Sequence, residues 1–104
     1  QATVSASSSA TTLDFSASNN FLVNMTADTT FTWSNLSGAI GCSGNIVLSQ
    51  DATGGRDFVL PSEAKTPING ATITQSTGAN EISVLSYYVV SASVVLVNYI
   101  GDFA

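Results

Sequence analysis

The chain has 104 residues, enough for one domain with a single core. Only 9% of its residues are charged, against about a quarter in ordinary soluble domains, and the net charge is −5 with two cations in all. Two cations cannot neutralise a phosphate backbone, and no apolar run reaches the roughly 20 residues of a membrane helix, so we expect neither nucleic-acid binding nor membrane insertion.

The first ten residues, QATVSASSSA, are small and mostly polar and show no periodicity, so they predict an extended N-terminal arm or linker. This arm begins at Gln1 rather than at a methionine, and it lacks the basic and apolar parts of a signal peptide. Both features are typical of a processed chain or of part of a longer one. Residues 11–104 make up the predicted domain.

From residue 13 onward, short segments alternate apolar and polar residues and are rich in β-branched and aromatic side chains, as half-buried strands are. About eight strands are predicted, at 13–15, 20–26, 30–36, 45–50, 57–60, 71–75, 80–90 and 93–100. Turn-forming residues separate them, and no segment shows the 3.6-residue stripe of a helix. The pattern predicts an all-β fold, an antiparallel β-sandwich of the jelly-roll type.

The stretch SQDATGGRDF at 49–58 holds one of the two cations, two acids and a Gly-Gly pair. It has neither the G-x-x-x-x-G-K-[ST] pattern of a phosphate-binding loop nor the ligand spacing of a calcium loop. We interpret it as a hairpin turn with Gly54 or Gly55 at positive φ, in which Arg56 reaches back to Asp51 or to a backbone carbonyl. An arginine that faces a partner protein is the alternative. The predicted structural turn consists of Asp51, Gly54, Gly55, Arg56 and Asp57.

The side chains that usually carry catalysis are scarce. There is no histidine, and Cys42 is the only cysteine, so the usual general base, an internal disulfide and a multi-cysteine zinc site are missing. GCSGN at 41–45 lacks the G-x-S-x-G order of a nucleophile elbow. Most of the seven acids fall at turns or strand ends, where they cap turns rather than form a carboxylate pair for glycoside hydrolysis. The sequence therefore predicts no enzyme activity, no metal and no cofactor.

The last two predicted strands carry apolar residues on both faces. In a sandwich with one solvated face alternate positions should be polar, so the second face predicts contact with another subunit. The predicted interface residues are Tyr87, Tyr88, Val95, Val97 and Tyr99. The three tyrosines and Trp33 could instead line a sugar-binding face, although such residues more often belong to a core or a subunit interface.

Three stretches follow one another along the chain: NNFLVNMTADTTFTWSNL, GNIVLSQDATGGRDFVLPSEAK and NGATITQSTGANEISVLSYYVV, before a final VVLVNYIGDFA. This order resembles a domain of tailed-bacteriophage virion proteins, found in tail fibres and related structural proteins, in which an apolar strand ends in Q-D-A-T-G-G-R. The resemblance covers about residues 19–104, and Gln50 to Arg56 is its most specific part. The chain departs from the family pattern at Glu81, where an aspartate is frequent. It also lacks the proline that the family often has near Thr72.

The resemblance implies an all-β, homotrimeric virion component without an enzymatic role, and it does not give the position on the virion. Our leading hypothesis is a tail-fibre or tail-tip domain that serves host attachment. Its partners would be copies of itself, other virion proteins and a host surface glycan. A capsid decoration or cement protein is the alternative within this class, and a carbohydrate-binding module is the alternative of another class. The 51–57 loop resembles the structural turn of this family.

Overall fold

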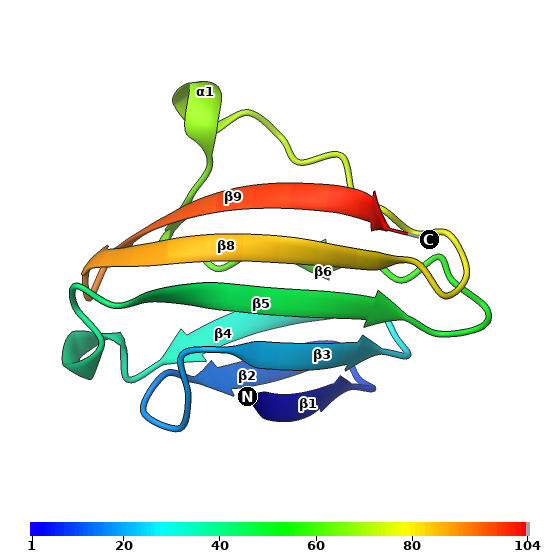
Figure 1. Ribbon diagram of the computed structural model, residues 1–104, viewed down its shortest axis with the longest axis horizontal. Coiled ribbons are helices and arrows are strands. Elements are labelled where there is room, and N and C mark those ends of the chain that lie inside the picture. Colours follow the sequence, from blue (N-terminus) through cyan, green and yellow to red (C-terminus); the bar gives the residue numbers. More distant parts are fainter. Residues whose placement is uncertain (104) are drawn as a thin grey trace.

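The computed structural model describes residues 1–103, which form nine strands and two single helical turns (Figure 1). The strands are β1 (Ala2–Ala6), β2 (Ala10–Asp14), β3 (Phe21–Met25), β4 (Thr29–Ser34), β5 (Ser43–Gln50), β6 (Phe58–Val59), β7 (Ala64–Lys65), β8 (Ile82–Ser91) and β9 (Val94–Phe103), and the turns are η1 (Leu36–Gly38) and α1 (Pro67–Gly70). A six-stranded sheet has the order β1-β3-β5-β8-β9-β7, and a three-stranded sheet has the order β2-β4-β6. The prediction of an all-β fold is confirmed.

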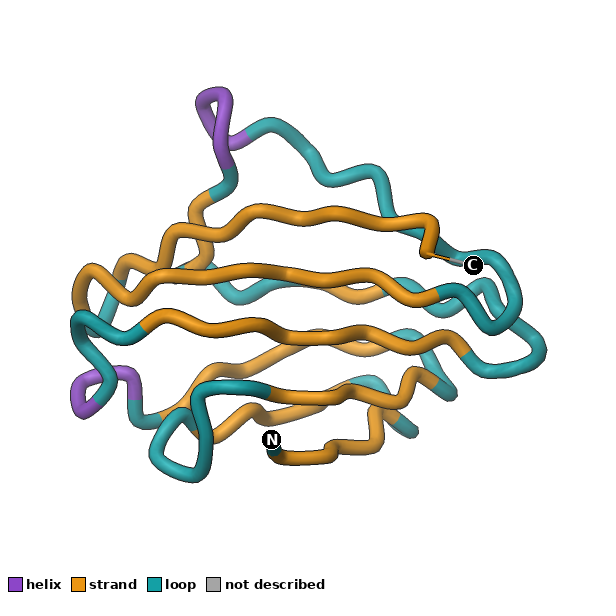
Figure 2. The backbone as a smooth tube through the Cα atoms, in the orientation of Figure 1, coloured by secondary structure: helices purple, strands orange, loops and turns teal. Residues whose placement is uncertain are grey.

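From β1 to β6 the chain alternates between the two sheets and so winds as a flattened coil (Figure 2). Strands of successive coils pair in parallel, β1 with β3 and β3 with β5 in the large sheet, and β2 with β4 and β4 with β6 in the small one. β8 then runs antiparallel to β5, and β9 antiparallel to β8. The predicted antiparallel jelly roll is therefore wrong, because five of the seven pairings among residues 1–103 are parallel.

The core lies between the two sheets, because alternate side chains of each strand point inward. Phe15, which follows β2, sits at the centre of an aromatic cluster. Its ring centroid lies 5.2 Å from that of Phe21, 5.6 Å from that of Trp33 and 5.2 Å from that of Tyr87. Burial of one large apolar side chain contributes about 1.5–3 kcal/mol to folding, and edge-on ring contacts add to it. The cluster thus joins both sheets near the start of the coil.

Two segments differ from their predicted structure. The predicted arm at 1–10 contains β1, an extended edge strand that pairs with β3 of the same chain and buries Ala6 in the core. The predicted strand at 71–75 pairs with no strand within residues 1–103, and its Gln75 side chain instead binds the backbone of Phe58. An alternating pattern shows which residues can face a core, but it does not supply a neighbouring strand to pair with.

Candidate functional site

The 51–57 loop connects two different sheets, since β5 belongs to the large sheet and β6 to the small one. The predicted hairpin is therefore wrong. The buried amide of Gln50 holds the far end of the loop: its Nε2 donates to the Arg56 carbonyl at 2.6 Å, and its Oε1 accepts the Arg56 N–H at 3.0 Å. Gln75 binds Phe58 in the same way, at 2.7 and 2.9 Å. Two glutamine side chains thus take the place of a neighbouring strand.

Asp51 organises the near end of the loop. One carboxylate oxygen accepts the N–H groups of Thr53 and Gly54, at 3.1 and 2.9 Å, and the other accepts Arg56 Nη2 at 3.0 Å. The carboxylate of Asp57 takes no part in these bonds, and its backbone N–H binds Asp28 instead. The geometry around Asp51 is that of a fastened structural turn rather than of a ligand site.

Both glycines of the loop have positive φ, 71° at Gly54 and 75° at Gly55. They differ in their surroundings. A Cβ at Gly54 would lie 2.6 Å from the Thr77 carbonyl oxygen and 2.7 Å from the Ala79 nitrogen, whereas a Cβ at Gly55 would have no atom within 4 Å. The N–H of Gly55 binds the Thr77 carbonyl at 2.7 Å. The loop is therefore packed tightly, through Gly54, against the turn that precedes β8.

The hydrogen bond from Arg56 to Asp51, with that from Gly54, lowers the pKa of the Asp51 carboxyl below its ordinary value of 3.8. A lowered folded-state pKa contributes stability that is present above the ordinary pKa and is lost as the pH falls through the lowered value. Asp51→Asn keeps an oxygen for the two N–H groups and removes the acceptor for Arg56, and with it the ion pair. In thermal melts we expect this variant to have a lower melting temperature than the natural protein at pH 7. The difference between the two melting temperatures should disappear below about pH 4. Asp57→Asn is the charge-matched control, and a gap unchanged by acid would contradict the role of the ion pair.

The predicted interface residues do not share one face. Tyr87, Val95 and Val97 are buried in the core and cannot meet a partner, and Tyr99 lies on the same inner side of the sheet. Of the five, Tyr88 alone is exposed on the other side. Because Trp33 and Tyr87 are both buried, the aromatic residues do not form an exposed row for sugar stacking either.

Tyr87 has a structural role instead. Its hydroxyl donates to the Asn19 carbonyl, and its burial raises the pKa of the phenol to about 12. Removing the hydroxyl by Tyr87→Phe leaves the Asn19 carbonyl without this donor and should lower the free energy of unfolding by about 1 kcal/mol. Denaturant titration would measure it, with Tyr88→Phe as the control that should change little. Equal stabilities for Tyr87→Phe and the natural protein would contradict this role.

The solvent-facing side of the six-stranded sheet, here called the outer face, is where exposed apolar residues gather. Register places Leu22, Val47, Val84 and Ile100 in one row across the sheet, and Tyr88 beside Leu96 in another. Tyr88 is 47% exposed, Leu96 49% and Ile100 56%. A polar row of Asn45, Ser86 and Asn98 separates the two apolar rows.

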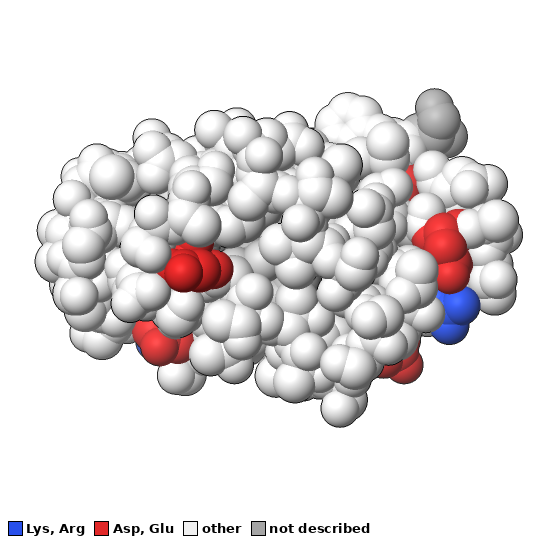
Figure 3. All heavy atoms as spheres, turned by 90° about the horizontal axis from the view of Figure 1, so that it is seen from below, with Lys and Arg blue, Asp and Glu red and all other residues white. Residues whose placement is uncertain are grey.

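Charge is sparse over the surface. The side of the molecule shown in Figure 3 carries a few separate acidic groups and little basic surface, and most of the area belongs to uncharged residues. Within residues 1–103 no three His, Cys, Asp or Glu side chains come together as metal ligands would. In the same range no helix is long and apolar enough to cross a membrane.

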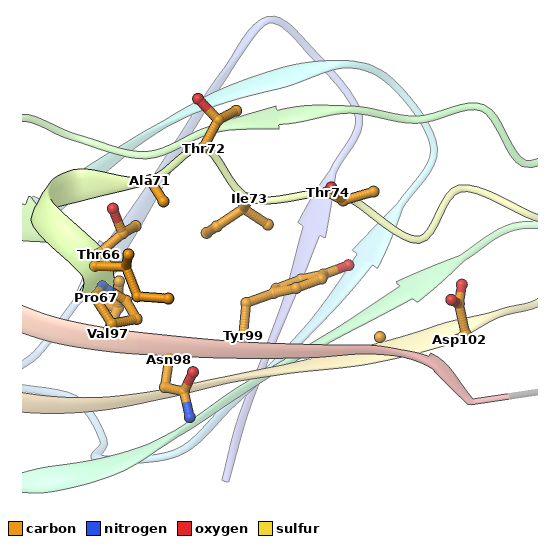
Figure 4. Close-up of a pocket in the computed structure, with 12 residues that line it drawn as sticks. Thr66, Pro67, Ala71, Thr72, Ile73, Thr74, Val97, Asn98, Tyr99 and Asp102 are labelled. Atoms are coloured by element: carbon orange, nitrogen blue, oxygen red, sulfur yellow. The ribbon is translucent and has the colours of Figure 1, made fainter.

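A pocket of about 310 Å³ lies between β9 and the 66–74 segment, which includes α1 (Figure 4). Thr66, Ile73 and Thr74 line it on the segment's side, and Tyr99 and Asp102 line it on the β9 side. In Figure 4 the Tyr99 side chain leaves β9 on the side of Ile73, whereas Asn98 points to the opposite side of β9. The pocket thus combines an aromatic wall, hydroxyl groups and one carboxylate.

Comparison with known proteins gives one positive result. Residues 7–91 match the family model described as "Putative phage tail fibre C-terminal domain". Neither a curated protein nor a solved structure matches the chain significantly. The matched range begins one residue after β1 and runs to the end of β8, so it includes the whole 51–57 loop.

Proposed function

The chain belongs to the family of phage tail fibre C-terminal domains, and from this we propose that it is a non-enzymatic structural module that packs with copies of itself in the fibre and serves host attachment. Membership makes it a component of the phage particle. The self-association and the attachment are the proposal: the outer face of the six-stranded sheet is the observation that carries the self-association, and the attachment rests on the family membership.

The outer face has the character of a surface that is covered in the assembled protein. Besides Tyr88, Leu96 and Ile100, it exposes Ile82 and Val90, all on the adjacent strands β8 and β9. Exposed apolar patches that are rimmed by polar residues mark interaction sites in soluble proteins. Its polar row is made of uncharged amides and a hydroxyl, which are less costly to remove from water than charges are.

Copies of the same chain suit this face as partners. In a closed ring of copies the contacts are head-to-tail, so the outer face of each subunit would meet a different surface of the next copy. Only 9% of the residues are charged, so few charged groups would have to leave water in such a contact. Three copies is the number that the resemblance to fibre proteins implies.

Host attachment is tested by adsorption. The fluorescently labelled 104-residue chain should bind cells of the bacterium that the phage infects, and in excess it should slow the adsorption of whole particles. A matched label on an unrelated β-protein is the control for nonspecific binding. Absence of cell binding together with unchanged particle adsorption would overturn the attachment role.

A further inference from the structure

The pocket beside β9 is formed where that strand has an open edge. β7 pairs with β9 only at Val95 and Leu96. The Val95 N–H points to this side, because it donates to the Glu63 carbonyl at 2.8 Å. Backbone groups alternate sides along a strand, so the N–H and C=O of Tyr99 also face the open edge. Within residues 1–103 no backbone hydrogen bond reaches them from the 71–75 segment.

Ser76 holds the pocket walls in place. Its N–H donates to the Tyr99 hydroxyl at 2.8 Å, and its Oγ accepts the Asp102 N–H at 3.0 Å. The same Oγ donates to Glu81 at 3.0 Å. Gly101 allows this close fit, since a Cβ there would lie 2.9 Å from the Ser76 Cβ and 3.1 Å from the Tyr99 ring. The Tyr99 ring and the backbone of Asp102 are thus held relative to one another before any ligand arrives.

The length of the open edge favours a small ligand over a peptide strand. β7 closes one end of it at Leu96. Toward the other end the β8–β9 pairing is irregular between Ile82 and Val84, and Asp102 has a φ of 62°. A peptide that adds to a sheet depends on a row of main-chain hydrogen bonds, and few positions remain for it here. A volume of about 310 Å³ is at the small end of ligand pockets, enough for one or two sugar rings.

The chemistry of the lining fits a sugar without charge. An aromatic ring packs against the C–H face of a pyranose, and hydroxyls, backbone groups and a carboxylate bind its hydroxyl groups. The Asp102 carboxylate accepts no hydrogen bond from any residue in 1–103 and would repel an acidic sugar. Arg56 is paired with Asp51, and neither Arg56 nor Lys65 is among the residues that line the pocket.

We propose that the pocket between β9 and the 66–74 segment binds one or two rings of a neutral sugar, with Tyr99 as the stacking wall and Asp102 as the acceptor for sugar hydroxyls. The proposal rests on the proposed host-attachment function, for which it names the class of ligand and the site.

Amide-resolved NMR of the 104-residue chain tests the site with defined probes: the methyl glycosides of glucose, galactose, rhamnose and N-acetylglucosamine, with galacturonic acid as the acidic comparison. At about 10 mM, a concentration that fills a site of millimolar Kd, at least one neutral probe should shift the amides of Thr74, Tyr99 and Asp102. Galacturonic acid should shift them less. Asp102→Asn and the isosteric Thr74→Val should each weaken binding, the former by about tenfold.

Asp57→Asn, which removes the same charge outside the pocket, should bind like the natural protein. Failure of every neutral probe to shift these amides would overturn the sugar site. Shifts that are the same in Asp102→Asn as in the natural protein would also overturn it. So would a result in which an extended peptide shifts these amides and no sugar does. If the sugars fail while the labelled chain still binds host cells, the attachment function stands without this site. If cell binding itself fails, the attachment function is the part that is wrong.

Discussion

Replacing Gly54 by alanine should lower the free energy of unfolding by about 3 kcal/mol, whereas the same change at Gly55 should cost only about 1 kcal/mol. Both positions have positive φ, which costs a residue with a Cβ about 1–2 kcal/mol. Only the Cβ at Gly54 would also collide with backbone atoms of Thr77 and Ala79, and such overpacking costs a further 1–3 kcal/mol or so. Equilibrium denaturation of the two variants beside the natural protein measures both losses.

Gly55→Ala is the internal control in this experiment, because it introduces the same strain at the adjacent position without the collision. The difference between the two variants therefore reports the packing of the loop against the turn before β8. Equal losses at Gly54 and Gly55 would show that this packing is absent in solution. The 51–57 loop would then not be a tightly fixed connection between the sheets.

Replacing Leu96 and Ile100 together by threonine should shift the assembled protein toward monomers. The two side chains are about half exposed in the single chain, and completing their burial in an interface contributes about 2 kcal/mol. Losing that contribution weakens association about thirtyfold at each interface. Threonine is β-branched, so the strand itself should persist. Light scattering across a dilution series gives the association constants.

Val59→Thr is the matched control, because Val59 is 58% exposed but lies on β6 of the small sheet, away from the outer face. It should assemble like the natural protein. Far-ultraviolet circular dichroism checks that all variants remain folded. If Leu96→Thr with Ile100→Thr leaves the association constant unchanged, copies do not meet through the outer face.

The positions of most strands could be predicted from the sequence, but their partners could not. Alternation of side chains locates a strand such as β3 or β4 and says nothing of which strand lies beside it. The parallel coil leaves no regular repeat, because Ala2 pairs with Phe21 at a separation of 19 residues and Phe21 with Ile46 at a separation of 25. Because the connections between the sheets differ in length, the repeated winding of the chain does not appear as a fixed period in the sequence.

The candidate surfaces were harder to predict, for a similar reason. Both faces of β8 carry apolar residues, so the alternation of residues along the strand could not show that Tyr87 points inward and Tyr88 outward. Even a polar residue, Ser83, lies on the buried side. The ion pair between Asp51 and Arg56 joins residues five apart, within reach of sequence reasoning. The bond between Gln75 and Phe58 spans 17 residues and depends on the tertiary fold.

The mass of the 104-residue chain in solution is the most direct test of the central claim, that this tail-fibre domain assembles with copies of itself through the outer face. Sedimentation equilibrium at micromolar concentration should give about three times the 10.7 kDa of one chain. Hydrogen exchange of the same sample should show that the backbone amides of β8 and β9 are more strongly protected than in the variant with Leu96→Thr and Ile100→Thr. A stable monomer of 10.7 kDa that remains soluble with its outer face open to water would contradict the claim.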